Sequence, residues 1–253
     1  MTDGLLPWPA TRVREDFRVA VVTVNYNTRE LIARLLYSLY SLLGGDLLGS
    51  VVVVDNGSDD GSVELLAPLA ERGLITLVRN ESNRYHGPGL TQGVNWLASH
   101  APDVDLVWLL DSDCVVLRSD IGLAIEAAWR AGADVLGDPD DGESFFLNSL
   151  VIDPVRIWLP GIGPFREDGD PARHLLAAAG DRELQLVGFP FRRQGYVLHV
   201  GRATLAQVVE RGEVDNIYHE WAFTHRQPHW GSNPDGASLW AAFDQEFTQP
   251  SPI

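Results

Sequence analysis

The sequence has 253 residues, and 45% of them are hydrophobic, which is enough to bury a sizeable core. Its formal net charge of -16 repels polyanions, so neither nucleic acid nor anionic lipid is an expected partner. The single cysteine, Cys114, excludes an intramolecular disulfide and suits a reducing compartment.

The chain begins with residues 1–17, which contain Pro, Gly and mixed charges and which we expect to form an N-terminal lead-in. The β-branched apolar run FRVAVVTVNYN then predicts a buried strand. Asn27, with Glu30 three positions later, is typical of a helix that starts with a capping box. Leucines at helical spacing continue from there to a stop signal at Gly44-Gly45.

The same alternation of strand and helix continues to about residue 139. Further strands are predicted by the apolar runs SVVVVDNGS, LITLVRN, VDLVWLLDSD and ADVLGDP. Helices are predicted over DDGSVELLAPLAERG, HGPGLTQGVNWLASH and DIGLAIEAAWRAG, although Pro68 weakens the second half of the first. Strands that alternate with helices predict an α/β fold with a mostly parallel sheet flanked by helices.

Polar residues follow four of these strands. They are Asn25 and Asn27, Asp55 and Asn56, Arg79 and Asn80, and Asp111 and Asp113. In a parallel sheet the ligand site lies at the carboxyl ends of the strands. Carboxylates are costly to bury without a partner, so we expect the two aspartates to lie at the mouth of a crevice and not in the core.

The pattern Asp-x-Asp occurs four times in this acidic chain, so the pattern alone is weak evidence. Only the pair Asp111 and Asp113 closes a strongly apolar strand in the alternating region. Two carboxylates there suit Mn²⁺ or Mg²⁺, cations that take oxygen ligands and commonly bridge a diphosphate. Turn or helix-capping chemistry is the alternative that the spacing leaves open.

Several phosphate-binding and nucleophile motifs are absent from the sequence. No G-x-G-x-x-G follows the first strand, and no G-x-x-x-x-G-K-[ST] occurs anywhere. This absence argues against a dinucleotide oxidoreductase and against a P-loop NTPase. A G-x-S-x-G nucleophile elbow is also missing.

The chain resembles the family 2 glycosyltransferases of the GT-A fold in four segments with the family's order and spacing, VAVVTVNYNTRELIARLLYSL, VVVVDNGSDDGS, LVRNESNRYHGPGLTQGVN and DLVWLLDSD. The resemblance covers residues 18–118 closely and extends loosely to about residue 205. It implies a single domain with a GT-A-type, Rossmann-like sheet. Within the chain we expect a nucleotide-sugar-binding half (18–142), an acceptor and catalytic half (143–213) and a C-terminal tail rich in Trp and His (214–253).

The resemblance implies a place for the nucleotide base at the ends of the first two strands. Val24 and Asn25 would line the base, and Asp55 would hydrogen-bond it. Turn and cap chemistry is the alternative for Asn25 and Asp55. The sequence departs from the family here, because VNYN replaces the usual Pro or Thr and NRYHGPG replaces a simpler Asn-x-Gly.

The aspartate pair corresponds to the family's DXD motif. By resemblance, Asp111, Ser112 and Asp113 would contact the nucleotide-sugar, with Asp111 near the ribose and the metal and Asp113 as a ligand of Mn²⁺ or Mg²⁺. The segment GYVLHVGRATL looks like the strand-His-Gly segment that carries a histidine to the metal in related enzymes, so His199 is a candidate third ligand. Its alternatives are a satisfied core histidine and a competing ligand group in the tail, His219, His225 and His229.

The segment FREDGDPARHLLAAAG is similar to the acidic cluster that supplies a base in family members. A positioned carboxylate can take the proton of an attacking hydroxyl. We expect Asp168 to be this base, with Asp170 second and Glu167 third. Gly169 departs from the family's apolar residue, and charge pairing at a helix start before Pro171 is the alternative.

These expectations predict a metal-dependent glycosyltransferase that moves a sugar from a nucleoside diphosphate-sugar to the hydroxyl of a sugar or small-molecule acceptor. Inversion is favoured over retention because a base candidate is visible. The alternatives are a sugar nucleotidyltransferase, which usually needs a Gly-rich basic loop after the first strand, and an inactive nucleotide-binding module. A homodimer is left open. We expect a cytoplasmic protein, since the sequence shows neither a secretory signal nor the roughly 20 apolar residues of a membrane span.

Overall fold

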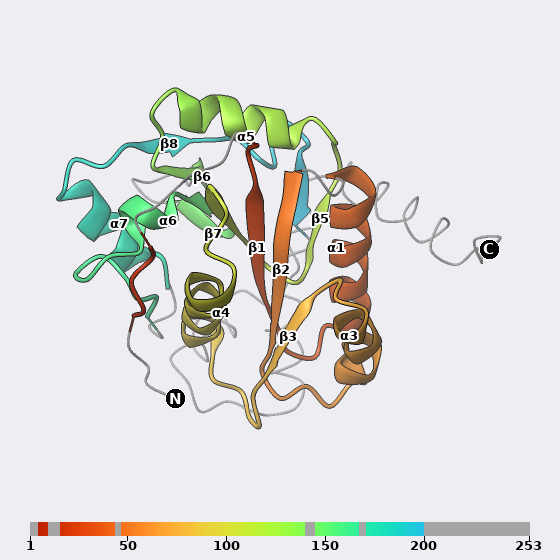
Figure 1. Cartoon of the computed structure of the whole chain (residues 1–253). Helices are drawn as coiled ribbons and strands as arrows, with labels where there is room; N and C mark the ends of the chain where they lie inside the picture. The colour runs from red at the N-terminus through yellow and green to blue at the C-terminus, as the bar shows by residue number, and fades with distance from the viewer. Residues whose placement is uncertain (1–4, 10–15, 44–46, 140–144, 167–170, 200–253) are drawn as a thin grey trace, which may run out of the picture. The chain divides into compact units, whose positions relative to one another are not determined.

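The structure is a computed structural model that describes residues 5–9, 16–43, 47–139, 145–166 and 171–199. All of these residues lie within one unit, Met1–His199 (Figure 1). The acidic cluster 167–170 and the tail 214–253 lie outside the described residues. The domain boundaries after residue 142 therefore stay predictions.

A mixed sheet forms the centre of this unit. Within the described residues it has seven strands in the order β3-β2-β1-β4-β7-β6-β8. All neighbouring pairs are parallel except those that involve β7, which runs antiparallel to both β4 and β6. The strands are β1 (Val19–Asn25), β2 (Leu48–Asp55), β3 (Thr76–Arg79), β4 (Leu106–Leu110), β6 (Val135–Pro139), β7 (Phe145–Ile152) and β8 (Leu186–Gly188). The predicted mostly parallel α/β sheet is confirmed.

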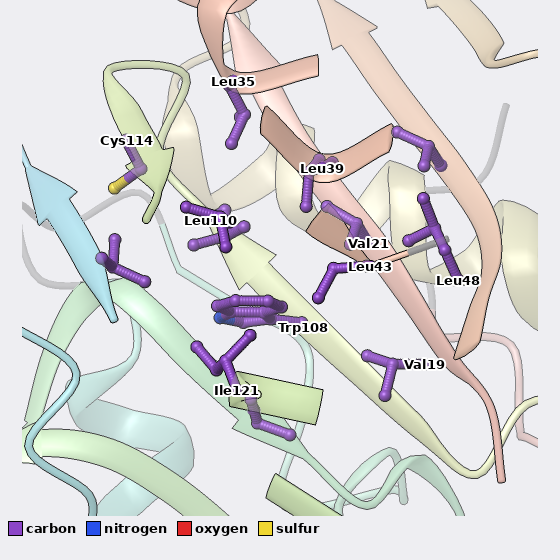
Figure 2. Packing of buried hydrophobic residues seen from close by; sticks show 14 of the residues in the cluster. Val19, Val21, Leu35, Leu39, Leu43, Leu48, Trp108, Leu110, Cys114 and Ile121 are labelled. Atoms are coloured by element: carbon purple, nitrogen blue, oxygen red, sulfur yellow. The ribbon is translucent and has the colours of Figure 1, made fainter. Parts of the chain in front are cut away.

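Helices cover both faces of the sheet because the central strands are buried on both sides. Val19 and Val21 of β1 pack into a cluster with α1, α3 and α5, whereas Ala20 and Val22 pack into a second cluster with α4 and α7. Figure 2 shows the first cluster around Trp108 of β4. The helices are α1 (Arg29–Leu42), α3 (Ser62–Glu71), α4 (His86–His100), α5 (Ile121–Arg130), α6 (Pro154–Ile157) and α7 (Arg173–Gly180). Among the described residues, no helix combines the length and apolar character needed to cross a membrane.

The start of α1 differs from the expected capping box. The residue before the helix is Thr28, whose side chain does not cap it, and the N–H of Arg29 donates to Oδ2 of Asp60 at 2.8 Å. Asn27 instead adopts a positive φ of 55°, and its Oδ1 accepts a hydrogen bond from the backbone N–H of Asp59 at 2.9 Å. The capping-box prediction is wrong because Asn27 joins the loops that follow β1 and β2. Pro68 does not end α3, which continues to Glu71.

The chain turns sharply after β4, and this turn explains why the apolar run around the aspartates is interrupted. Asp111 to Asp113 form the turn, which is closed by a 3.0 Å hydrogen bond from Cys114 N–H to the Asp111 carbonyl. The chain then enters β5 (Cys114–Val116), which pairs with β9 (Val197–His199) in a separate two-stranded sheet. The two apolar runs therefore belong to different sheets, and the aspartates lie between them.

Core packing around α1 gives a first prediction. Leu39 is fully buried between α1 and the sheet (Figure 2), whereas Leu123 of α5 is 71% exposed. We expect Leu39→Ala to lower the free energy of unfolding by about 2–5 kcal/mol through lost burial and a residual cavity. The matched control Leu123→Ala should stay within about 0.5 kcal/mol. Urea denaturation of both variants measures this, and equal effects would contradict the assigned core.

Candidate active site

Two carboxylates and an imidazole meet beyond the carboxyl end of β4. Nε2 of His199 lies 3.2 Å from Oδ1 of Asp113 and 3.5 Å from Oδ2 of Asp111. The aspartates come from the turn between β4 and β5, and His199 comes from the end of β9. Antiparallel pairing places His199 opposite Cys114, and this register brings a residue distant in sequence into the site.

The electrostatics of this cluster are dominated by the two aspartates. Burial alone would lower the pKa of His199, but the charge of Asp113 and hydrogen bonds with Asp111 and Asp113 raise it to about 10. Burial likewise opposes ionisation of Asp111, yet the nearby His86 and His199 hold its pKa below the ordinary value. Without a metal, the protonated imidazole of His199 is therefore the positive charge that balances the carboxylates.

The donor set fits a hard divalent cation. Two carboxylates and one imidazole nitrogen converge on a small volume, and oxygen with nitrogen ligands suits Mn²⁺ or Mg²⁺. Oδ1 of Asp111 is buried and accepts no hydrogen bond, so it keeps lone pairs that a cation could use.

Among the described residues, Asp113, Cys114 and His199 have possible ligand atoms within 4.8 Å of one another, so Cys114 must be considered as a ligand. Burial and the adjacent carboxylates raise the pKa of its thiol well above the ordinary value, so it stays protonated. The thiol donates to the backbone carbonyl of Asn148 at 3.2 Å, and its side chain belongs to the apolar cluster in Figure 2. Cys114 is therefore a core residue, and the ligand candidates are Asp113 and His199, with Asp111 beside them.

A buried hydrogen-bond network joins the ends of β1 and β2. Nδ2 of Asn25 donates to Oδ2 of Asp55 at 2.8 Å. Oδ1 of Asp55 accepts from the backbone N–H groups of Gly57 and Ser58 at 3.2 and 3.0 Å, which is an Asx-type turn. The turn chemistry left open by the sequence is thus present at Asp55, and its contact with a nucleotide base stays a prediction.

Thr28 links this network to the aspartate turn. Its hydroxyl hydrogen-bonds Oδ1 of Asn25 at 2.7 Å and the hydroxyl of Ser112 at 2.8 Å. The predicted base contacts and the Asp-Ser-Asp turn are therefore parts of one connected structure. Val24, the remaining predicted base contact, lies beside Gly89 of α4, where a Cβ would come within 2.9 Å of the valine side chain.

The start of α4 also reaches the aspartates. His86 is the first residue of α4, and its Nε2 lies 3.3 Å from Oδ1 of Asp111. The positive end of the helix dipole is near the same carboxylate, which adds to its stabilisation. Sequence reasoning did not select His86, although it lies in NRYHGPG, the segment that departs from the family pattern.

The acidic cluster 167–170 lies outside the described residues, but both of its flanks are described. Arg166 N–H donates to the carbonyl of Pro171 at 3.4 Å, which closes the loop. The backbone of Arg166 presses on Gly87, where a Cβ would come within 1.9 Å of the Arg166 carbonyl oxygen. Because Gly87 follows His86, the ends of the loop that carries Asp168 and Asp170 are anchored beside the aspartate site.

Known proteins share the sequence pattern and the fold of this chain. Residues 20–144 match the family model for glycosyl transferase family 2. No curated protein matches the sequence. Among solved structures, the mannosyltransferase PcManGT from Pyrobaculum calidifontis, in complex with GDP-Man and Mn²⁺, is similar with a TM-score of 0.59 at 20% identity, covering 88% of this chain and 67% of that one.

Two other solved structures share the fold. Residues 1–349 of S. aureus TarS give a TM-score of 0.54 at 18% identity, covering 77% of this chain and 64% of that one. Glucosyl-3-phosphoglycerate synthase from Mycobacterium tuberculosis, in complex with Mn²⁺, UDP and glucosyl-3-phosphoglycerate, gives a TM-score of 0.50 at 15% identity. The match covers 79% of this chain and 82% of that one. At such identities these likenesses establish the fold.

The raised pKa of His199 predicts how the stability of metal-free protein depends on pH. Folding raises the pKa of His199 from 6.5 to about 10, so binding a proton at His199 stabilises the folded state. This contribution to the free energy of unfolding is complete below pH 6.5 and is lost as the pH rises through 10. The stability difference between the wild type and His199→Gln should therefore shrink as pH rises from 6.5 to 10. Urea denaturation with a chelator present measures it, with the exposed His100→Gln as control. A pH-independent difference would contradict the assignment.

Proposed function

Because the chain belongs to glycosyl transferase family 2 through residues 20–144, we propose that it is a metal-dependent glycosyltransferase that transfers a sugar from a nucleoside diphosphate-sugar to an acceptor hydroxyl. The observation that carries the proposal is the meeting of Asp111, Asp113 and His199 beyond the end of β4. The family match favours glycosyl transfer over the sugar nucleotidyltransferase alternative.

Each group of residues has a separate task in this proposal. Asp113 and His199 would hold the cation, and Asp111 would lie near the cation and the ribose. A bound Mn²⁺ or Mg²⁺ would neutralise charge that develops on the diphosphate leaving group. Asn25 and Asp55 orient the base, and their internal hydrogen bonds keep both side chains in place before the nucleotide arrives.

We propose direct displacement with inversion for the chemical step. The acceptor oxygen bonds to the anomeric carbon as the bond to the diphosphate breaks, and the acceptor proton moves to a carboxylate of the acidic cluster. Asp168 is the proposed base, with Asp170 second and Glu167 third. The anchoring of Arg166 beside Gly87 supports this role, because it holds one end of the cluster next to the aspartate site.

A substitution at Asp113 tests the metal-dependent function. Asp113→Ala removes one carboxylate ligand, so Mn²⁺-dependent binding of UDP or GDP should be lost while metal-independent binding remains. The matched control is Asp103→Ala, which alters an Asp-x-Asp pair before β4 at an exposed position. Isothermal titration of both variants with and without Mn²⁺ measures this. Unchanged metal-dependent affinity in Asp113→Ala would overturn the assignment.

Substitutions in the acidic cluster test the base. Asp168→Asn keeps the shape but removes basicity, so single-turnover rate should fall about 10²–10⁴-fold, the usual contribution of general-base catalysis. Donor affinity should change by less than about threefold, which is roughly 0.7 kcal/mol. Asp170→Asn is the matched comparison and should cost less turnover. If only Asp170→Asn abolishes turnover, Asp170 is the base and the glycosyl-transfer proposal survives.

A further inference from the structure

Asn148 occupies a buried position between the two segments that supply the metal-ligand candidates. It lies on β7, the strand that pairs with β4, and its side chain is almost fully buried. Sequence reasoning attached no role to it, because it is a single polar residue within the apolar run FFLNSLVI. A buried amide in such a strand requires hydrogen-bond partners, so its contacts are informative.

The backbone of Asn148 holds the aspartate turn. Its carbonyl oxygen accepts the N–H of Asp111 at 3.1 Å and the thiol of Cys114 at 3.2 Å. These two donors flank Ser112 and Asp113, so both ends of the turn are tied to one carbonyl group. The positions of the carboxylates therefore depend on where β7 places Asn148.

The side chain of Asn148 holds the histidine. Its Nδ2 lies 2.9 Å from Nδ1 of His199, while Nε2 of the same ring faces the two carboxylates. Strand pairing with β5 positions the His199 backbone, but it leaves the ring free to rotate about its side-chain bonds. The contact between Asn148 Nδ2 and His199 Nδ1 therefore orients the ring so that Nε2 faces the aspartates.

An asparagine suits this position because its amide can meet either form of the ring. Nδ2 can donate to Nδ1 only in the neutral ring that lacks a hydrogen there. When Nδ1 carries a hydrogen, as in the protonated ring, the amide turned over presents Oδ1 as its acceptor. A cation held by Nε2 needs that nitrogen's lone pair, so Nδ1 must carry the hydrogen and needs an acceptor. Oδ1 of Asn148 is buried and has no hydrogen-bond partner, so it is available to be that acceptor.

We propose that Asn148 is the positioning residue of the metal site, which fixes the aspartate turn through its carbonyl and orients His199 through its amide. The inference rests on the proposed metal-dependent function and extends it to a residue that does not touch the cation. Outer partners of a ligating histidine typically account for 10–100-fold in metal affinity.

The test measures Mn²⁺ affinity of the full chain by isothermal titration, without nucleotide. Asn148→Leu keeps the size but removes the hydrogen bond, and we expect a 10–100-fold loss of Mn²⁺ affinity. Asn148→Asp restores an acceptor for Nδ1–H and should bind at least as tightly as the wild type. The matched control is Ser149→Ala, at the next residue of β7. It removes the buried hydroxyl that accepts a 3.0 Å hydrogen bond from Nε1 of Trp108 on β4, and it should leave Mn²⁺ affinity unchanged.

The outcomes separate this inference from the proposed function. A folded Asn148→Leu protein that binds Mn²⁺ within about threefold of the wild type would overturn the inference alone. A wild type that binds no Mn²⁺ would overturn the metal-dependent function and the inference with it. If Asn148→Leu does not fold, Asn148→Ala, which also removes the amide, is measured in its place: a 10–100-fold loss of Mn²⁺ affinity supports the role, and affinity within about threefold of the wild type overturns it.

Discussion

Negative charge concentrated at the end of β4 is the constraint around which the rest of this site is arranged. Asp111 and Asp113 lie where the sheet is largely buried, and two close carboxylates in such surroundings require positive charge nearby. Two segments supply it, namely β9 with the imidazole of His199 and α4 with the positive end of its dipole beside Asp111. Each comes from a different part of the chain, so the position of the charge pair determines which segments must meet.

Much of the fold could be predicted from the sequence because β1, β2 and β4 are buried on both faces. Such strands have continuous apolar runs, and the helices between them have a distinct period. The insertion of β7 against β4 could not be predicted, since antiparallel pairing of a distant strand leaves no local pattern. The same limit applied at Asn27, whose side chain has a partner in the next loop and does not cap its own helix.

The site was predictable only in part for related physical reasons. The aspartates stand out as charges at the end of an apolar strand. Asn25 and Asp55 also follow apolar strands, but only the resemblance to a family suggested their roles. Thr28 and Asn148 have no such signal, because their importance comes from partners far away in the sequence. Residues that hold a site together through tertiary hydrogen bonds can be identified only once the strands that carry them have been placed.

The state of Cys114 has a practical consequence for spectroscopy. It is the only thiol in the chain, it is fully buried, and its pKa is raised, so little reactive thiolate forms at neutral pH. Cys114 should therefore not react with thiol-directed spin labels or fluorophores, and it does not need to be replaced before labelling. A cysteine introduced at the exposed position of Leu123 would therefore react selectively with such a label.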